Sequence, residues 1–173
     1  FADSRFNIYE GPQNPELLLI TCGAGFLFSR EAVQFLGLDA RVGILKIGTT
    51  WPLPEDFILD HFKKAKKVLF VEEVDPVLEN NVKELFADRN SELPHISFLG
   101  KKSGTVPAVG ELSPGLVIQV LANLTGVPIP DVDKRYLEET EGILNNFAPA
   151  RSLAFCPGCP HRATFWAVKK ALA

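Results

Sequence analysis

The stretch Cys156-Pro157-Gly158-Cys159-Pro160-His161 holds the residue types with the most chemistry in this chain. Two thiols separated by two residues can share one metal ion or one iron of a cluster, and His161 can add a third ligand. A zinc site or a cluster needs further ligands, and the remaining cysteine, Cys22, is far away in sequence. A glycine turn that leads into a helix also presents free backbone N–H groups, which suit a phosphate group. No suitable strand precedes the motif, as a redox dithiol would require.

A second candidate is the carboxylate pair Glu72 and Glu73, which follows a predicted strand, with Asp75 two residues further on. Functional groups gather at the carboxyl edge of open α/β sheets, and adjacent carboxylates can bind a cation or share a proton. The favoured interpretation is structural. In it Asp75 caps the next helix, and the glutamates form hydrogen bonds or ion pairs.

A third candidate, Gly23-Ala24-Gly25, follows a predicted strand and invites comparison with a dinucleotide-binding turn. The third glycine of that pattern is missing, because residues 26–28 are Phe-Leu-Phe, and the predicted helix begins only at Ser29. We therefore expect a glycine turn that lets a helix pack tightly on its strand. His61 and His95 have no Cys or His at metal-ligand spacing, and we expect them to be ordinary surface or hydrogen-bonded histidines.

The elements that would position these residues alternate between short apolar runs and amphipathic helices. Strands are predicted at 17–22, 42–47, 68–71 and 96–99. Helices are predicted from Ser29 to Leu36, from Pro54 into the lysines at 63–67, from Asp75-Pro76 onward, and from Ser113-Pro114 to Gly126. This alternation predicts an α/β fold with a parallel or mostly parallel sheet covered on both faces.

The character of the sequence changes after residue 126. An extended connector at 127–130 leads to a charged helix at 131–147, and a second connector leads to the cysteine motif. The sequence therefore predicts an α/β domain at 1–126, a helical linker at 127–154, and the opening of a further domain at 155–173. Phe165, Trp166 and Val168 in that opening would need partners to bury against. Because the chain starts at Phe1 and contains no Met, we expect it to be a piece of a longer protein.

Composition excludes several classes of function. The net charge of −3, with Lys and Arg scattered among Asp and Glu, does not form a nucleic-acid footprint. No apolar run approaches the roughly 18 residues of a membrane span. Three cysteines do not make a disulfide framework, so a reducing cytoplasm is the expected location.

The longer phrase at 156–162, Cys-Pro-Gly-Cys-Pro-His-Arg followed by Ala-Thr-Phe, resembles the start of the thiamine-diphosphate domain in alpha subunits of indolepyruvate:ferredoxin oxidoreductases. Earlier segments resemble the middle domain of these 2-oxoacid:ferredoxin oxidoreductases, in the same order. They are the Cys-Gly-Ala-Gly at 22–25, Leu-Lys-Ile-Gly at 45–48, Trp-Pro-Leu-Pro at 51–54, Val-Glu-Glu at 71–73, Gly-Lys-Lys at 100–102 and Gly-Glu-Leu-Ser-Pro at 110–114. The resemblance covers residues 6–170.

This resemblance implies a fold like the C-terminal domain of transketolase, a three-layer α/β structure with a mostly parallel five-stranded sheet and one antiparallel edge strand. It implies an enzyme that oxidatively decarboxylates aryl pyruvates such as indolepyruvate to aryl-acetyl-CoA and reduces ferredoxin. The implied cofactors are thiamine diphosphate, Mg²⁺ and 4Fe–4S clusters, and the implied partner is a beta subunit. The middle domain packs between cofactor domains, so this piece alone is expected to be structural and inactive.

The resemblance gives the cysteine motif two alternative roles. In related pyruvate-type enzymes a similar Cys-x-Gly-Cys ligates a cluster, which would make Cys156 and Cys159 metal ligands. Alternatively Cys156, Gly158, Cys159 and His161 line the cofactor site. A rival hypothesis from the residues alone is a self-standing α/β interaction module whose CxxC-His tail binds zinc.

Overall fold

The computed structural model describes residues 4–131, 134–148 and 158–173. The chain divides into two compact units, 1–130 and 131–173, and each is described by itself. The domain boundaries predicted at residues 126 and 154 stay a prediction.

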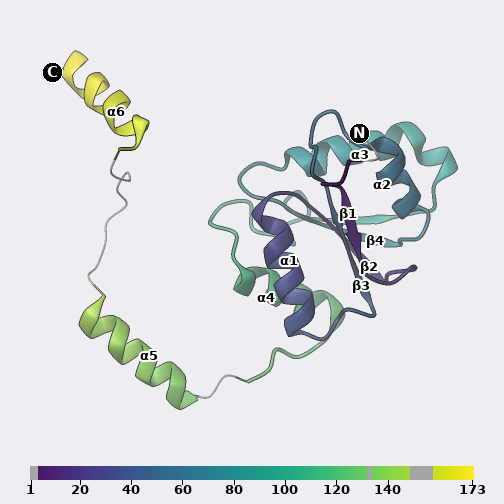
Figure 1. Ribbon diagram of the computed structural model, residues 1–173, viewed down its shortest axis with the longest axis horizontal. Coiled ribbons are helices and arrows are strands. Elements are labelled where there is room, and N and C mark those ends of the chain that lie inside the picture. Colours follow the sequence, from purple (N-terminus) through teal and green to yellow (C-terminus); the bar gives the residue numbers. More distant parts are fainter. Residues whose placement is uncertain (1–3, 132–133, 149–157) are drawn as a thin grey trace. The chain divides into compact units, whose positions relative to one another are not determined.

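The first unit is built on a five-stranded sheet in the order β1-β3-β2-β4-β5 (Figure 1). The strands are β1 (Ile8–Glu10), β2 (Leu17–Thr21), β3 (Val42–Lys46), β4 (Lys67–Val71) and β5 (Ser97–Leu99). The edge strand β1 runs antiparallel to β3, and the other three pairs are parallel. The four strands predicted from apolar runs are confirmed, as is the mostly parallel sheet with one antiparallel edge strand.

Four helices cover the two faces of this sheet (Figure 1). They are α1 (Ala24–Phe35), α2 (Glu55–Phe62), α3 (Val77–Arg89), which continues into the 3₁₀ turn η1 (Asn90–Glu92), and α4 (Pro114–Thr125). Successive residues of β2 point to opposite faces, so Leu17 and Leu19 pack with α1 and α4, whereas Leu18 and Ile20 pack with α2 and α3. Burial on both faces explains why β2 reads as an uninterrupted apolar run.

Helix α1 begins five residues earlier than predicted. Gly23 adopts φ 55°, a left-handed conformation that turns the chain at once from β2 into a helix starting at Ala24. Ser29 is therefore not a cap but a fully buried residue inside α1, and its Oγ has no hydrogen-bond partner in the described part of the chain. The first turn of α1 packs closely on the sheet, because a Cβ on Gly25 would meet Thr21 Oγ1 at 2.5 Å and the Val71 carbonyl oxygen at 2.7 Å.

The start of α3 also differs from the prediction that Asp75 caps it. The buried Glu72 carboxylate accepts hydrogen bonds from Leu78 N at 2.7 Å and Glu79 N at 2.8 Å, so the cap comes from the end of β4. Asp75 contributes its backbone carbonyl, which accepts from Val77 N at 2.8 Å. The connection between them turns through Val74, whose φ of 58° is a strained conformation for a β-branched residue.

The other helix ends follow their sequence signals with one exception. Ser113 Oγ accepts from Leu116 N at 3.3 Å, and Gly126 closes α4 in the left-handed conformation, as predicted. Helix α2 starts after Pro54 but ends at Phe62, so the lysines at 63–67 lie beyond it and Lys67 opens β4.

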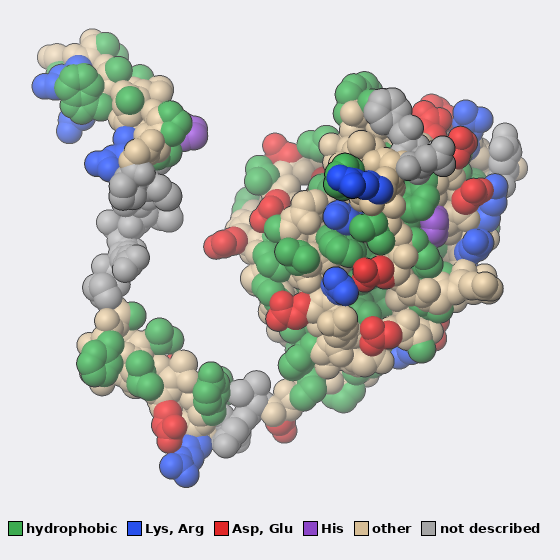
Figure 2. All heavy atoms as spheres, viewed as in Figure 1, with side chains coloured by type: hydrophobic (Ala, Val, Ile, Leu, Met, Phe, Trp, Pro, Cys, Tyr) green, Lys and Arg blue, Asp and Glu red, His purple; other side chains and the backbone are tan. Residues whose placement is uncertain are grey.

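The described residues of the second unit form two helices, α5 (Lys134–Phe147) and α6 (Pro160–Ala171). Both helices carry exposed large apolar side chains (Figure 2). They include Tyr136 and Phe147 on α5 and Phe165 and Trp166 on α6, each more than half exposed. Among the described helices of both units, none has the length and apolar character of a membrane span.

The close approach at Gly25 gives a stability prediction. Gly25→Ala should lower the free energy of unfolding by about 1–3 kcal/mol, because its Cβ would press on the buried, hydrogen-bonded Thr21 hydroxyl and on the β4 backbone. Gly115→Ala in α4 is the control, because its Cβ would meet nothing within 4 Å, and it should be neutral or raise stability by up to about 1 kcal/mol. Urea unfolding measures both, and equal effects would contradict the packing argument.

The Glu72 cap gives a second prediction. Glu72→Ala should lower the free energy of unfolding by about 2 kcal/mol, because two N–H groups at the start of α3 lose their acceptor. Glu73→Ala is the matched control, because Glu73 is the exposed neighbour on the same connection. Denaturant unfolding of the two variants at neutral pH compares them directly.

Glu72 also predicts a pH dependence with a defined sign. Burial raises the pKa of Glu72, and the Glu79 charge adds to this, whereas the two backbone N–H bonds and Lys101 oppose it. Because the folded-state pKa lies above the unfolded one, the stability from this group is greatest below the ordinary glutamate pKa and is lost as pH rises through the raised value. The free energy of unfolding of the wild type, measured relative to that of Glu72→Gln, should therefore fall as pH rises through that window. A difference that grows with pH would show the sign to be wrong.

Candidate functional site

The cysteine motif leads directly into α6. Gly158 has φ 79°, Cys159 occupies the N-cap position in an extended conformation, and Pro160 is the first helical residue. Proline fits there because the first N–H groups of a helix have no partner within the helix. Of the four predicted site residues, Gly158, Cys159 and His161 lie together at this N-terminus, and Cys156 lies outside the described residues.

Cys159 and His161 are the two groups of this site that approach each other. The Sγ of Cys159 lies 3.2 Å from the Nδ1 of His161. The two side chains thus form a thiol–imidazole pair at the surface, with Cys159 half-buried and His161 exposed.

The N-terminus of α6 is electrostatically suited to an anion. The first turn contains no acidic residue, and the basic side chains of His161 and Arg162 follow Pro160. The helix dipole gives this end a partial positive charge. A phosphate group is the kind of ligand that such a turn can hold.

The described residues do not by themselves complete a metal centre at this motif. Within the described part of the chain, no group of three or more His, Cys, Asp and Glu side chains is placed to hold a metal ion. The Cys159–His161 pair supplies two donors, whereas a structural zinc site has four and a 4Fe–4S cluster is held by four cysteines.

The carboxylates at the carboxyl edge of the sheet are used by the fold. Glu72 caps α3, and the fully buried Glu79 accepts from Lys101 N at 2.9 Å while forming an ion pair with Lys83. Lys101 Nζ in turn donates to the Val74 carbonyl. These contacts bind α3 to the loop after β5, and they favour the structural interpretation of Glu72.

Sequence reasoning did not single out Glu79. The signal was present, because Glu79, Val82 and Phe86 are three and four residues apart and so share the face of α3 that turns toward the core. A charge on that face needs a buried partner, which Lys83 supplies from the next helical turn.

The remaining candidates have structural surroundings. His61 Nδ1 lies 2.7 Å from the Phe57 carbonyl oxygen, and its ring packs against Tyr9 and Phe57. Cys22 follows β2 half-buried, and burial, followed by the charges of Glu72 and Glu73, raises the pKa of its thiol. A raised pKa leaves little thiolate at neutral pH, so Cys22 is poorly suited to act as a nucleophile.

Comparison with known proteins shows similarity to indolepyruvate oxidoreductase subunits. No protein-family model matches the chain. The indolepyruvate oxidoreductase subunit IorA of Pyrococcus horikoshii is 35% identical over 175 residues, which cover 99% of this chain and 25% of that subunit. The IorA subunit of Methanothermobacter marburgensis is 36% identical over 156 residues, covering 90% of this chain and 23% of that subunit.

A solved structure supports the fold. A split-gene transketolase, described as an inactive beta4 tetramer, matches 72% of this chain and 44% of that chain with a TM-score of 0.50 and 15% identity. This likeness agrees with the expected transketolase-like α/β domain. The chain spans about a quarter of the length of the curated relatives it matches. Along nearly its whole length, the chain is similar to that quarter of the indolepyruvate oxidoreductase subunit IorA.

Proposed function

We propose that this chain is the non-catalytic middle portion of the alpha subunit of an indolepyruvate:ferredoxin oxidoreductase. The observation that carries the proposal is the 35% identity to an IorA subunit over nearly the whole chain, including the residues that lead into α6. The parent enzyme would convert indolepyruvate or another aryl pyruvate to its aryl-acetyl-CoA and pass the electrons to ferredoxin. Its assembly would include a beta subunit.

The first unit supports a structural role within that enzyme. At the carboxyl edge, where a functional site would be expected in such a sheet, Glu72 and Glu79 are engaged with α3 and the loop after β5. Burial raises the pKa of the nearby Cys22 thiol. We infer that this unit positions its neighbours and that the chain alone does not turn over substrate.

The start of α6 is the part of the chain that we propose lies at the cofactor. Thiamine diphosphate, when bound, supplies the nucleophile and electron sink for decarboxylation. The residues present fit its anionic end, because Gly158, Cys159 and His161 lie at a helix N-terminus that has a basic side chain and no acidic residue in its first turn. Their role would be to bind and orient. Mg²⁺ and the 4Fe–4S clusters would be held mostly by parts of the parent protein that lie outside these 173 residues.

We further propose that Cys156 and Cys159 line this cofactor site rather than ligate a cluster. The imidazole of His161 occupies one side of the Cys159 sulfur at 3.2 Å, which is hydrogen-bond contact. A second candidate function is an interaction module in which the motif binds zinc through Cys156, Cys159 and His161, because Cys159 and His161 are donor types that zinc accepts and lie side by side.

The first test of the proposed function is an activity assay on the full-length parent protein, prepared anaerobically with its partner subunit. Reduction of a viologen dye should require indolepyruvate, thiamine diphosphate and CoA together. The 173-residue chain alone is the control and should be inactive. Absence of activity with every aryl 2-oxoacid, despite bound cofactor, would leave the fold intact and show the reaction to be misassigned.

The role of the motif is tested with Cys159→Ala and His161→Gln in the same parent protein. If these residues line the cofactor site, His161→Gln should weaken thiamine diphosphate binding by about tenfold, as expected for loss of one charge-assisted hydrogen bond. Iron and zinc content per subunit should stay unchanged in both variants.

His95→Gln, which changes an exposed histidine of the first unit, is the matched control and should leave both readouts unchanged. Loss of iron from Cys159→Ala with normal cofactor affinity would assign the cysteines to a cluster. Loss of zinc instead would favour the interaction module.

A further inference from the structure

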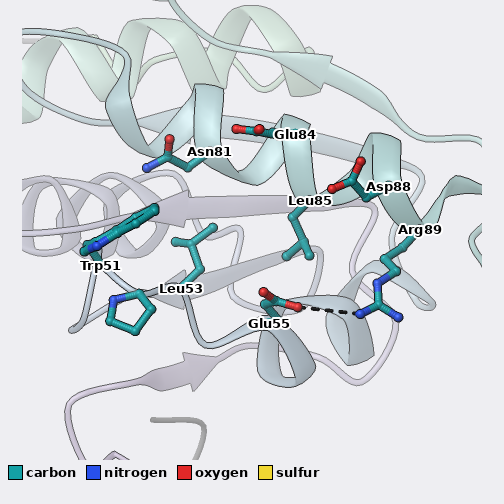
Figure 3. Close-up of a pocket in the computed structure, with 9 residues that line it drawn as sticks. Trp51, Leu53, Glu55, Asn81, Glu84, Leu85, Asp88 and Arg89 are labelled. Carbon is teal, nitrogen blue, oxygen red and sulfur yellow. Dashed lines mark ion pairs between the residues drawn. The ribbon is translucent and has the colours of Figure 1, made fainter.

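A groove of about 340 Å³ lies between α3 and the segment that leads into α2 (Figure 3). One wall is the face of α3 that carries Glu84 and Asp88, and the other begins with Trp51. Leu53 and Leu85 lie between the two walls. We call this feature the α2–α3 groove.

Trp51 makes the groove unusual for a surface depression. Its side chain is 81% exposed, more than any other aromatic side chain of the first unit that is described as exposed. The indole stands at one end of the groove, across from Asn81 (Figure 3). Large aromatic side chains that remain in water in this way are enriched among the residues that dominate protein–protein binding.

The charges of the groove are unbalanced. At the end away from Trp51, Glu55 pairs with Arg89 at 3.8 Å, which leaves that arginine engaged (Figure 3). Glu84 and Asp88 are exposed, and within the described residues neither forms an ion pair. They lie four residues apart on one helix face, where two like charges repel each other.

We propose that the α2–α3 groove binds an arginine side chain presented by a partner protein. A guanidinium group can stack on the Trp51 indole and also donate paired hydrogen bonds to a carboxylate. The apolar floor of Leu53 and Leu85 suits the aliphatic stem of the same side chain. The two uncompensated carboxylates supply the charge complementarity, and they exclude a nucleic acid as the occupant. This proposal does not depend on the reaction proposed above.

The experiment is a ¹⁵N NMR titration of the full chain with the peptide acetyl-Gly-Arg-Gly-Arg-Gly-amide. The chain has two tryptophans, so its two indole N–H signals are assigned by one variant, Trp166→Phe. The Trp51 signal should shift saturably at millimolar peptide, and the Trp166 signal should not. The lysine version of the peptide should bind more weakly, and the uncharged citrulline version should not bind.

Two variants separate specific binding from general attraction. Glu84→Gln/Asp88→Asn should weaken the arginine peptide by about tenfold, because two charge contacts are lost. Glu31→Gln/Glu111→Gln removes the same charge from exposed positions outside the groove and should leave the affinity unchanged. The NMR spectrum itself reports whether each variant is folded.

The proposal is overturned by an unshifted Trp51 signal at millimolar arginine peptide. It is equally overturned by an equal response to the lysine or citrulline peptide, or by an effect of the groove variant no larger than that of the control variant.

Discussion

The architecture of the first unit depends on two buried carboxylates, Glu72 and Glu79, which join the end of β4 to α3 and to the loop after β5. Buried charges of this kind are tolerated only when hydrogen-bonded and paired. Here Glu72 receives two backbone N–H groups of α3, and Glu79 receives Lys83 and the Lys101 amide. The direction in which α3 leaves the sheet is set by these bonds, and the acidic wall of the α2–α3 groove follows from that direction.

The sequence predicted helices, strands and caps correctly where the determining residues lie close together in the chain. Its predictions were wrong where a capping or packing residue comes from a distant part of the chain. The apolar runs of β2, β3 and β4, together with the Ser113 cap and the Gly126 stop of α4, are local signals, and the structure follows them. The cap of α3 was assigned to Asp75 because a carboxylate before Pro76 is the usual pattern, yet Glu72 is better placed once β4 fixes it beneath the helix.

The start of α1 was missed for a related reason. A serine before an amphipathic stretch is a strong cap signal, but Gly23 can adopt a left-handed turn and start the helix immediately after β2. Tertiary packing then fixes the start of α1, because Gly25 has no Cβ and the first turn of α1 can therefore approach Thr21 and Val71. In the candidate site, sequence identified the residues of the motif, whereas the contact between Cys159 Sγ and His161 Nδ1 required coordinates.

The two units differ in how they use their polar and apolar side chains. In the first unit the buried Glu72 and Glu79 accept hydrogen bonds from α3 and from the loop after β5, and a hydrophobic core lies on each face of the sheet. In the second unit α6 leaves Phe165, Trp166 and Leu172 exposed. Apolar exposure of this extent is costly in water, so the stability of α6 has to come from whatever covers it.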